Sequence, residues 1–358
     1  MNPTILSIYS GAGGIDLGFH HAGFITKYAT DYWEPACKTL EQNNIAEVIE
    51  CNDIREIDFR KTLKKLNIRK IDCLVGGPPC PAYSKSRFYR KEMGRALNDV
   101  NAYTLSEYFR ALDEIDPDIF FFENVHGFIY KPHRDAFNYL KARSNELGYN
   151  ISYRVVNAAD YGVPQTRERF ICIGSKMNLP SFIFPPTTHY NREKIKGSTR
   201  GKRQWITAGE AIGDLDFDLP EDKYKQAGSK HKDLLREVPP GDNYLYFTKE
   251  RGHPNPLFKW RSRYWSFLLK LSPDRPSWTI QASHSNNQGP FHWKNRFLRI
   301  AELKRLQTFD DNYQFYGDFK TVWRQIGNAV PPLLAQTIAT EIKRQYFLQS
   351  TKRITGWK

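Results

Sequence analysis

The stretch TILSIYSGAGGIDLGF, residues 4–19, decides the fold of this chain of 358 residues. Residues 4–9 have the apolar, β-branched composition of a buried strand. Gly11, Gly13 and Gly14 follow where the chain would turn into a helix, and glycines there allow a tight turn and a close approach of a ligand to the backbone. The spacing is not G-x-G-x-x-G, so an ordinary strand-to-helix turn is the alternative interpretation.

Outward from this stretch, strand-like and helix-like segments alternate up to about residue 174. The strand-like runs are residues 4–9, 25–30, 71–75, 119–122, 151–157 and 170–173. Helical period and length occur over residues 34–43, 101–112 and 135–147. This alternation predicts an α/β fold with a doubly wound, mostly parallel sheet.

The character of the sequence changes after about residue 180. Proline, glycine, basic and aromatic residues become frequent, and periodicity stays weak until residue 300. Helical patterning returns over residues 323–345. We therefore expect a large domain of residues 1–180 plus 322–358, and a second, smaller, loop-rich domain of residues 181–321.

The chain is strongly basic, with a formal net charge of +14 and a pI near 9.4. Such a charge favours a polyanionic partner, foremost a nucleic acid. The five cysteines form no CxxC pair and are odd in number, which argues against a disulfide framework and against a cysteine-held zinc ion. No apolar run approaches the roughly 18 residues of a membrane span, and no leader precedes the first strand, so we expect a cytoplasmic protein.

Acidic residues follow the next predicted strands at distances that suit an adenosine-type cofactor. Asp31 comes just after the second strand, and Asp53 lies in the turn Asn52-Asp53-Ile54. Each carboxylate can accept hydrogen bonds from ribose hydroxyls or an adenine amine. Each taken alone is more often a cap or turn residue, and only the combination with the glycine turn indicates a cofactor.

A thiol, a carboxylate and two arginines follow the central predicted strands. Cys80, in Gly-Gly-Pro-Pro-Cys, comes after the strand at 71–75, at the edge of the sheet where ligands bind. Glu123 directly follows the strand at 119–122, and burial would raise the pKa of its carboxyl group. Alternation puts Arg167 and Arg169 on one face. A packed cysteine, a capping glutamate and exposed arginines are the alternatives.

These motifs, in this order, resemble the C5-cytosine DNA methyltransferase family. The resemblance covers most of residues 4–174 and 296–342, and it adds Gly327-Asn328-Ala329-Val330-Pro331 and the stretch from Arg296 to Phe309. It implies an S-adenosylmethionine-dependent methyltransferase fold for residues 1–180 plus 322–358, and a target-recognition domain for residues 181–321. Cys80 is then the nucleophile that attacks C6 of cytosine. Glu123, helped by Arg169 and Arg167, would protonate or hydrogen-bond N3.

The resemblance also implies which residues bind. Around the cofactor, S-adenosylmethionine, it assigns Tyr9, Gly11, Gly13, Gly14, Asp31, Asp53, Ile54, Pro79, Leu105, Asn328 and Ala329. Double-stranded DNA would be held by the loop after the nucleophile, through Ser84, Lys85, Arg87 and Arg90. In the second domain the resemblance fades over residues 175–295, and the basic and polar side chains themselves indicate phosphate or base contacts at Arg200, Arg203, His284, Asn286 and Asn287. A solvated basic loop around residues 192–203 and an ordinary polar loop at 283–288 are the alternatives.

Pro81, Tyr83 and Asn101 depart from the family pattern and put the geometry of the loop after Cys80 in doubt. By family analogy, the expected protein is a monomeric bacterial enzyme that needs no metal and protects DNA from a cognate restriction endonuclease. Two other classes remain open at this point. One is an RNA cytosine methyltransferase, and the other is a non-enzymatic binding protein on the same fold.

Overall fold

The computed structural model describes residues 2–79, 103–195, 197–219, 227–261 and 264–348. The chain divides into two compact units. Unit 1 consists of Met1–Asn157, Glu168–Pro186 and Pro332–Lys358, and unit 2 consists of Ala158–Arg167 and Thr187–Pro331. Compared with the expected division, the short segment Ala158–Arg167 goes with the second unit, and the chain returns to the first unit at Pro332 rather than at residue 322.

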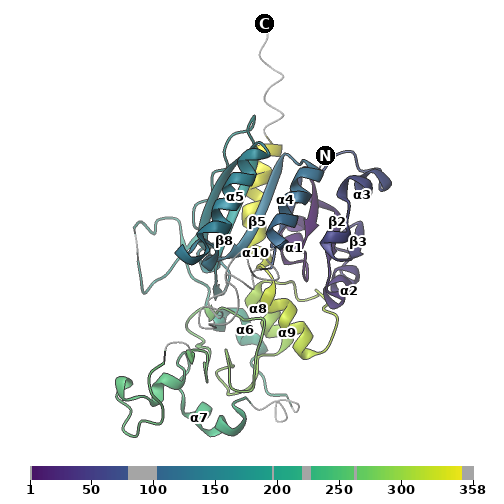
Figure 1. Cartoon of the computed structure of the whole chain (residues 1–358). Coiled ribbons are helices and arrows are strands. Elements are labelled where there is room, and N and C mark those ends of the chain that lie inside the picture. Colours follow the sequence, from purple (N-terminus) through teal and green to yellow (C-terminus); the bar gives the residue numbers. More distant parts are fainter. Residues whose placement is uncertain (1, 80–102, 196, 220–226, 262–263, 349–358) are drawn as a thin grey trace. The chain divides into compact units, whose positions relative to one another are not determined.

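Unit 1 is built on a seven-stranded sheet among the described residues, with the order β3-β2-β1-β4-β5-β8-β6 (Figure 1). β8 is antiparallel to both neighbours, β5 and β6, and the other neighbouring strands pair in parallel. The strands are β1 Thr4–Ile8, β2 Ile25–Asp31, β3 Val48–Cys51, β4 Cys73–Gly76, β5 Ile119–Val125, β6 Tyr149–Asn157 and β8 Glu168–Lys176. The predicted doubly wound, mostly parallel sheet is confirmed.

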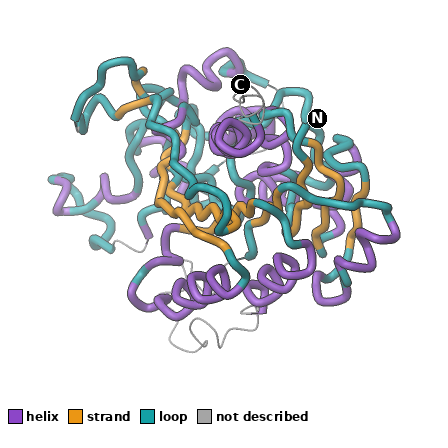
Figure 2. The backbone as a smooth tube through the Cα atoms, turned by 90° about the horizontal axis from the view of Figure 1, so that it is seen from above, coloured by secondary structure: helices purple, strands orange, loops and turns teal. Residues whose placement is uncertain are grey.

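Helices cover both faces of this sheet (Figure 2). Side chains alternate along β5, so Phe120 and Phe122 enter a core cluster with α4 and α5, whereas Phe121 contacts Phe19 of α1 on the other face, with ring centroids 5.5 Å apart. A Cβ at Gly18 would lie 2.5 Å from that of Ala335, so glycine lets α1 and α10 pack closely. The helices are α1 Gly14–His21, α2 Glu34–Gln42, α3 Phe59–Lys65, α4 Tyr103–Ile115, α5 Arg134–Glu146 and α10 Pro332–Ile342.

Unit 2 contains only short elements among its described residues, as its weak periodicity indicates. They include β7 Gln165–Thr166, β9 His189–Tyr190, β10 Arg203–Gln204, α6 Ala208–Ile212, α7 Lys232–Glu237, β11 Ser277–Trp278, α8 Ile300–Gln307 and α9 Phe319–Asn328. The helical pattern at 323–345 is not one helix, because α9 ends at Asn328 and α10 begins at Pro332, directly after Pro331. Two cores, one around Trp323 and one around Phe247, hold the loops of this unit.

Within the described parts of the chain, no helix has the length and apolar character needed to cross a bilayer. The same residues contain no group of three His, Cys, Asp or Glu side chains arranged to hold a metal ion.

Candidate active site

The glycine turn predicted after β1 forms at the carboxyl edge of the sheet. Tyr9, Gly11 and Gly13 all have positive φ, at 54°, 53° and 78°, which explains the two glycines. Gly13 stands at the N-cap of α1. The N–H of Gly11 donates a 2.8 Å hydrogen bond to Oδ2 of Asp31, so the turn and the end of β2 are joined directly. The two features that sequence reasoning paired are therefore in contact.

Asp31 is held by backbone donors on both of its oxygens. Oδ1 accepts from the N–H of Trp33 at 2.9 Å, and Oδ2 accepts from Gly11. Both backbone donors fix the orientation of this carboxylate at the end of β2. The next residue, Tyr32, exposes 65% of its surface. Sequence reasoning did not single out Tyr32, although a large aromatic residue directly after Asp31 at the end of the strand could have drawn attention to it.

Asp53 caps a short 3-10 helix, Ile54–Glu56, and pairs with Arg55. Nη2 of Arg55 lies 2.6 Å from Oδ2 of Asp53, and this hydrogen-bonded partner lowers the pKa of the aspartate. The Arg55 guanidinium also covers the ring of Tyr103 at 4.6 Å. Ile54 and Leu105 are buried in the core of unit 1, where their side chains pack.

Tyr9 connects the glycine turn to the loop that leaves β4. Its hydroxyl donates to the carbonyl of Thr104 at 2.8 Å, and burial raises the pKa of the phenol. The hydroxyl of Thr104 in turn donates to the carbonyl of Pro79 at 3.4 Å. Pro79 is the last described residue before position 80. Cys80, Ser84, Lys85, Arg87 and Arg90 lie outside the described residues, together with Pro81, Tyr83 and Asn101.

Glu123 and Asn124, near the end of β5, contact the loop that leaves β4. A Cβ on residue 77 would lie 2.8 Å from Oε2 of Glu123, so Gly77 leaves the space that this carboxyl group occupies. The amide of Asn124 donates to the carbonyl of Pro78 at 3.3 Å. A buried carboxyl group thus faces the backbone three residues before Cys80.

Arg169 completes this cluster from the neighbouring antiparallel strand, β8. Its Nε lies 2.8 Å from Oε1 of Glu123, and each side chain is only 12% exposed. A charged hydrogen bond in such surroundings fixes the orientation of the carboxyl group. The arrangement can therefore present a carboxyl group of fixed orientation to a polar ring at the carboxyl edge of the sheet.

The family model for C-5 cytosine-specific DNA methylases matches residues 4–344. The chain belongs to this family. The methylase is 38% identical to the type II methyltransferase M.SacI of Streptomyces achromogenes, across 95% of this chain and 93% of that relative. It is 33% identical to M.FnuDI of Fusobacterium nucleatum, across 95% and 94% of the two chains.

Solved structures share the fold of the methylase. A DNA modification methyltransferase encoded within an E. coli prophage matches with a TM-score of 0.68 at 21% identity, over 96% of this chain and 99% of that one. DNMT2 of Spodoptera frugiperda matches with a TM-score of 0.61 at 18% identity, over 95% and 99%.

Arg167 of the methylase does not share a strand face with Arg169, so that prediction is wrong. The strand ends at Thr166 and a new one begins at Glu168, which breaks the alternation between them. Arg167 is 1% exposed, and its guanidinium donates to the carbonyls of Ile280, Gly327 and Ala329 at 3.0, 2.8 and 3.0 Å. Its partners are carbonyl groups of unit 2.

A buried polar hub surrounds Arg167 in unit 2. The amide of Gln165 donates to the side chain of Gln307 at 2.6 Å, and its oxygen accepts from the N–H of Ile280 at 3.1 Å. Gln307 donates to the carbonyl of Ala329 at 2.6 Å. Asn328 and Ala329, predicted around the cofactor, belong to unit 2, and the exposed Asn328 stands between two carbonyls that the hub holds. Sequence reasoning assigned no role to either glutamine.

The residues predicted to contact DNA in unit 2 differ in accessibility. Arg200, Arg203 and Asn286 are exposed, and Asn287 is half-buried. The ring of His284 stacks on that of Trp323, with centroids 4.6 Å apart, and burial lowers the pKa of the imidazole. His284 therefore contributes to packing as well as to the surface.

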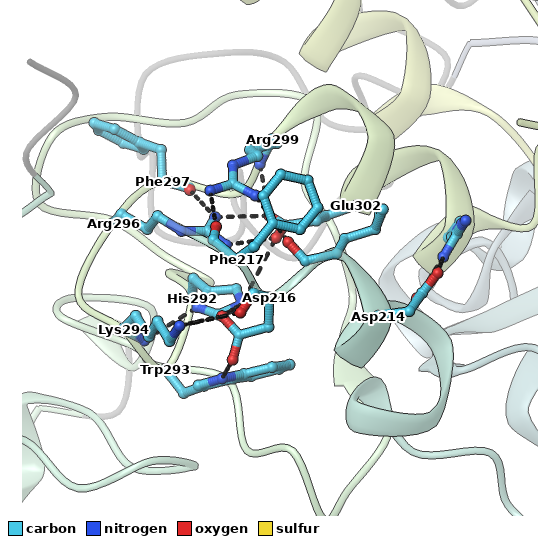
Figure 3. A network of polar contacts seen from close by, with 12 residues as sticks. Asp214, Asp216, Phe217, His292, Trp293, Lys294, Arg296, Phe297, Arg299 and Glu302 are labelled. Atoms are coloured by element: carbon cyan, nitrogen blue, oxygen red, sulfur yellow. Dashed lines mark hydrogen bonds and ion pairs between the residues drawn. The ribbon is translucent and has the colours of Figure 1, made fainter. Parts of the chain in front are cut away.

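The stretch 296–309 that sequence reasoning matched to the family anchors α8 through a buried network (Figure 3). Arg296 donates to both oxygens of Glu302, at 2.8 and 2.6 Å, and Glu302 is fully buried. His292 is also fully buried, and its Nε2 lies 3.6 Å from Oε1 of Glu302 and 3.7 Å from Oδ1 of Asp216. Burial lowers the pKa of the imidazole to about 3. An ion pair between Arg305 of α8 and Asp214 ties the 3-10 turn Gly213–Leu215 to this helix.

Proposed function

We propose that this methylase transfers a methyl group to C5 of a cytosine in a specific double-stranded DNA sequence, through a covalent bond between Cys80 and C6. The ion pair of Glu123 with Arg169 against Gly77 and Pro78 is the observation that carries the proposal. It supplies an oriented carboxyl group that lies against Gly77, three residues before the nucleophile in the sequence. Membership of the C-5 cytosine-specific DNA methylase family supports the same reaction.

Glu123 would hold or deliver a proton at N3 of the target ring. Attack at C6 pushes electron density onto the ring, and a hydrogen bond at N3 stabilises the charge that develops. Arg169 keeps the carboxyl group in one orientation, so little reorganisation is needed during the reaction. Arg167, whose guanidinium is occupied by three carbonyls, would act as a positioning residue for the turn that carries Asn328.

The residues at the carboxyl edge of β1 and β2 fit S-adenosylmethionine. Asp31 would accept hydrogen bonds from the ribose hydroxyls, because the N–H groups of Gly11 and Trp33 orient its carboxylate at the end of β2, beside the glycine turn. The exposed ring of Tyr32 offers an apolar face to the adenine. S-adenosylmethionine, when bound, would supply the methyl group that reaches C5.

Unit 2 would hold the DNA, since the target cytosine must leave the helical stack before a thiol can reach C6. Exposed Arg200 and Arg203 support phosphate contacts. The relatives are named as type II methyltransferases, which supports an enzyme that protects DNA from a cognate restriction endonuclease.

A mechanism-based trap tests the proposal. Fluorine at C5 cannot leave as a cation, so duplex DNA with 5-fluorocytosine at the target should remain covalently attached when S-adenosylmethionine is present. Denaturing electrophoresis would show the adduct with the unmodified protein and none with Cys80→Ala. An undiminished adduct with that variant, or none with the unmodified protein on DNA containing its methylated sequence, would reject the mechanism. Bisulfite sequencing of DNA from expressing cells identifies that sequence.

A further inference from the structure

Two thiols from different elements converge on the backbone of Asp31. Cys37 is buried in α2, and its Sγ lies 3.3 Å from the carbonyl oxygen of Asp31, to which the S–H donates. Cys51 is the last residue of β3 and is the strand partner of Asp31 in the parallel register. The N–H of Asn52 donates to the same carbonyl oxygen at 3.1 Å.

Both cysteines therefore lie beside one backbone group, since Cys37 donates to the carbonyl of Asp31 and Cys51 is the strand partner of Asp31. Burial, followed by a hydrogen bond to the Cys51 thiol, raises the pKa of Cys37. Cys51 is exposed, so a small reagent in solution reaches it first. Neither thiol takes part in the proposed methyl transfer, and Cys73 and Cys172 are buried in the strands β4 and β8.

We propose that Cys37 and Cys51 form an oxidisable dithiol site that reacts with a peroxide and thereby weakens cofactor binding. The effect on cofactor binding rests on the proposed function of Asp31, whereas the formation of the disulfide does not. The two cysteines lie on α2 and β3, on either side of the strand end that carries this carboxylate.

The reaction balances with hydrogen peroxide as the oxidant. The thiolate of Cys51 attacks one peroxide oxygen, the O–O bond breaks, and a sulfenic acid forms with release of one water. The Cys37 sulfur then attacks the sulfenic sulfur, the S–O bond breaks, and a second water leaves with the Cys37 proton. Two thiols are oxidised to one disulfide while one peroxide is reduced to two waters.

Disulfide formation would change the support of Asp31 directly. Cys37 would lose the proton that it donates to the Asp31 carbonyl, and α2 would become covalently tied to the end of β3. A disulfide holds the two sulfurs about 2 Å apart, so the side chains of Cys37 and Cys51, and with them the backbone around Asp31, would rearrange. The carboxylate that faces Gly11 would move with it.

The full-length chain with Cys80→Ala is the protein to test, because this change removes the family nucleophile from the peroxide reaction. The protein is treated with one equivalent of hydrogen peroxide, digested and analysed by mass spectrometry. Calorimetry then measures binding of S-adenosylhomocysteine before oxidation, after oxidation and after reduction with dithiothreitol. Cys51→Ser in the same background is the matched control.

We expect a cross-linked peptide pair containing Cys37 and Cys51, about tenfold weaker cofactor binding, which corresponds to roughly 1.4 kcal/mol, and recovery on reduction. The Cys51→Ser control should keep its affinity after peroxide. Absence of this cross-link, unchanged affinity despite it, or an equal loss in the control would overturn the inference. If the reduced protein fails to bind the cofactor while the cross-link forms, the proposed function of the Asp31 site fails instead.

Discussion

Arg169 on β8 reaches across the antiparallel pair to place its Nε 2.8 Å from Oε1 of Glu123 on β5, and both side chains are largely buried. The other oxygen of the same carboxyl group lies against Gly77. One carboxyl group is therefore fixed from two sides, by a cation and by the backbone that continues into Cys80. The proposed chemistry depends on this relationship.

Glu123→Gln should slow methyl transfer by about a hundredfold or more, which is the usual effect of removing a proton-transferring group. The amide keeps the size of the side chain but cannot carry the proton at N3. Single-turnover kinetics with labelled cofactor would measure the rate, and calorimetry should show nearly unchanged cofactor affinity. Loss of cofactor binding in this variant would mean that the glutamate acts elsewhere.

Arg167→Met and Arg169→Met should separate stability from catalysis. Arg167→Met leaves three buried carbonyls without their charged donor and should cost about 3 kcal/mol or more of unfolding free energy. Arg169→Met should cost less, on the order of 1 kcal/mol, because its site retains some solvent. Urea unfolding measures the loss of stability in each variant, and the methylation rate measures the loss of catalysis. Equal stability losses would contradict the distinction.

Asp31→Asn should weaken binding of S-adenosylmethionine, because the amide nitrogen cannot accept the hydrogen bonds that the carboxylate oxygens accept. We expect about a tenfold increase in the dissociation constant, the consequence of losing one to two kcal/mol. Tyr32→Ala tests the exposed ring in the same titration. Unchanged affinity in both variants would place the cofactor away from the end of β2.

Arg203→Gln should weaken DNA binding without changing cofactor affinity. Arg203 is exposed on β10, and each lost phosphate contact should reduce the slope of log affinity against log salt by about one. Fluorescence anisotropy at several salt concentrations would give the slope. Exposed Lys65 of α3 in unit 1 supplies the control Lys65→Gln, which should leave the slope unchanged.

The stability of unit 1 should fall as the pH rises from about 4 to 7, because burial raises the pKa of Asp16 to about 7. In the unfolded chain this carboxyl group ionises near its ordinary value of 3.8, whereas in the folded chain it keeps its proton until the higher pKa. Up to roughly 4 kcal/mol of the free energy of unfolding would be lost between these two pH values, and Asp16 would cause no further loss at higher pH.

Asp16→Asn should remove this part of the pH dependence, because the amide carries no titratable proton. Urea midpoints at pH 5 and pH 8, compared between the two proteins, give the measurement. An identical change in both would show that Asp16 does not titrate as its burial indicates.

Strands could be predicted from the sequence wherever they are buried, because a buried strand is a continuous apolar run. β1, β4 and β5 are apolar runs, and the prediction of their order along the chain needed only local sequence. β3 was missed because Val48–Cys51 is short and only half-buried, so its residues carry no strong apolar pattern. The ends of α2, α4 and α5 were predicted within a few residues, since caps and turns are local signals, whereas the pattern at 323–345 proved to be two helices.

The sequence by itself determined the alternation of strands and helices, the glycine turn, and the order of the thiol, the carboxyl group and the arginines. These are properties of neighbouring residues, because side-chain periodicity and turn chemistry act over a few positions. Only the tertiary structure decided that Arg169 pairs with Glu123 while Arg167 holds carbonyls more than a hundred positions away. Two arginines separated by one residue take different partners because a break in one strand redirects the chain, and no local pattern encodes which distant backbone will lie there.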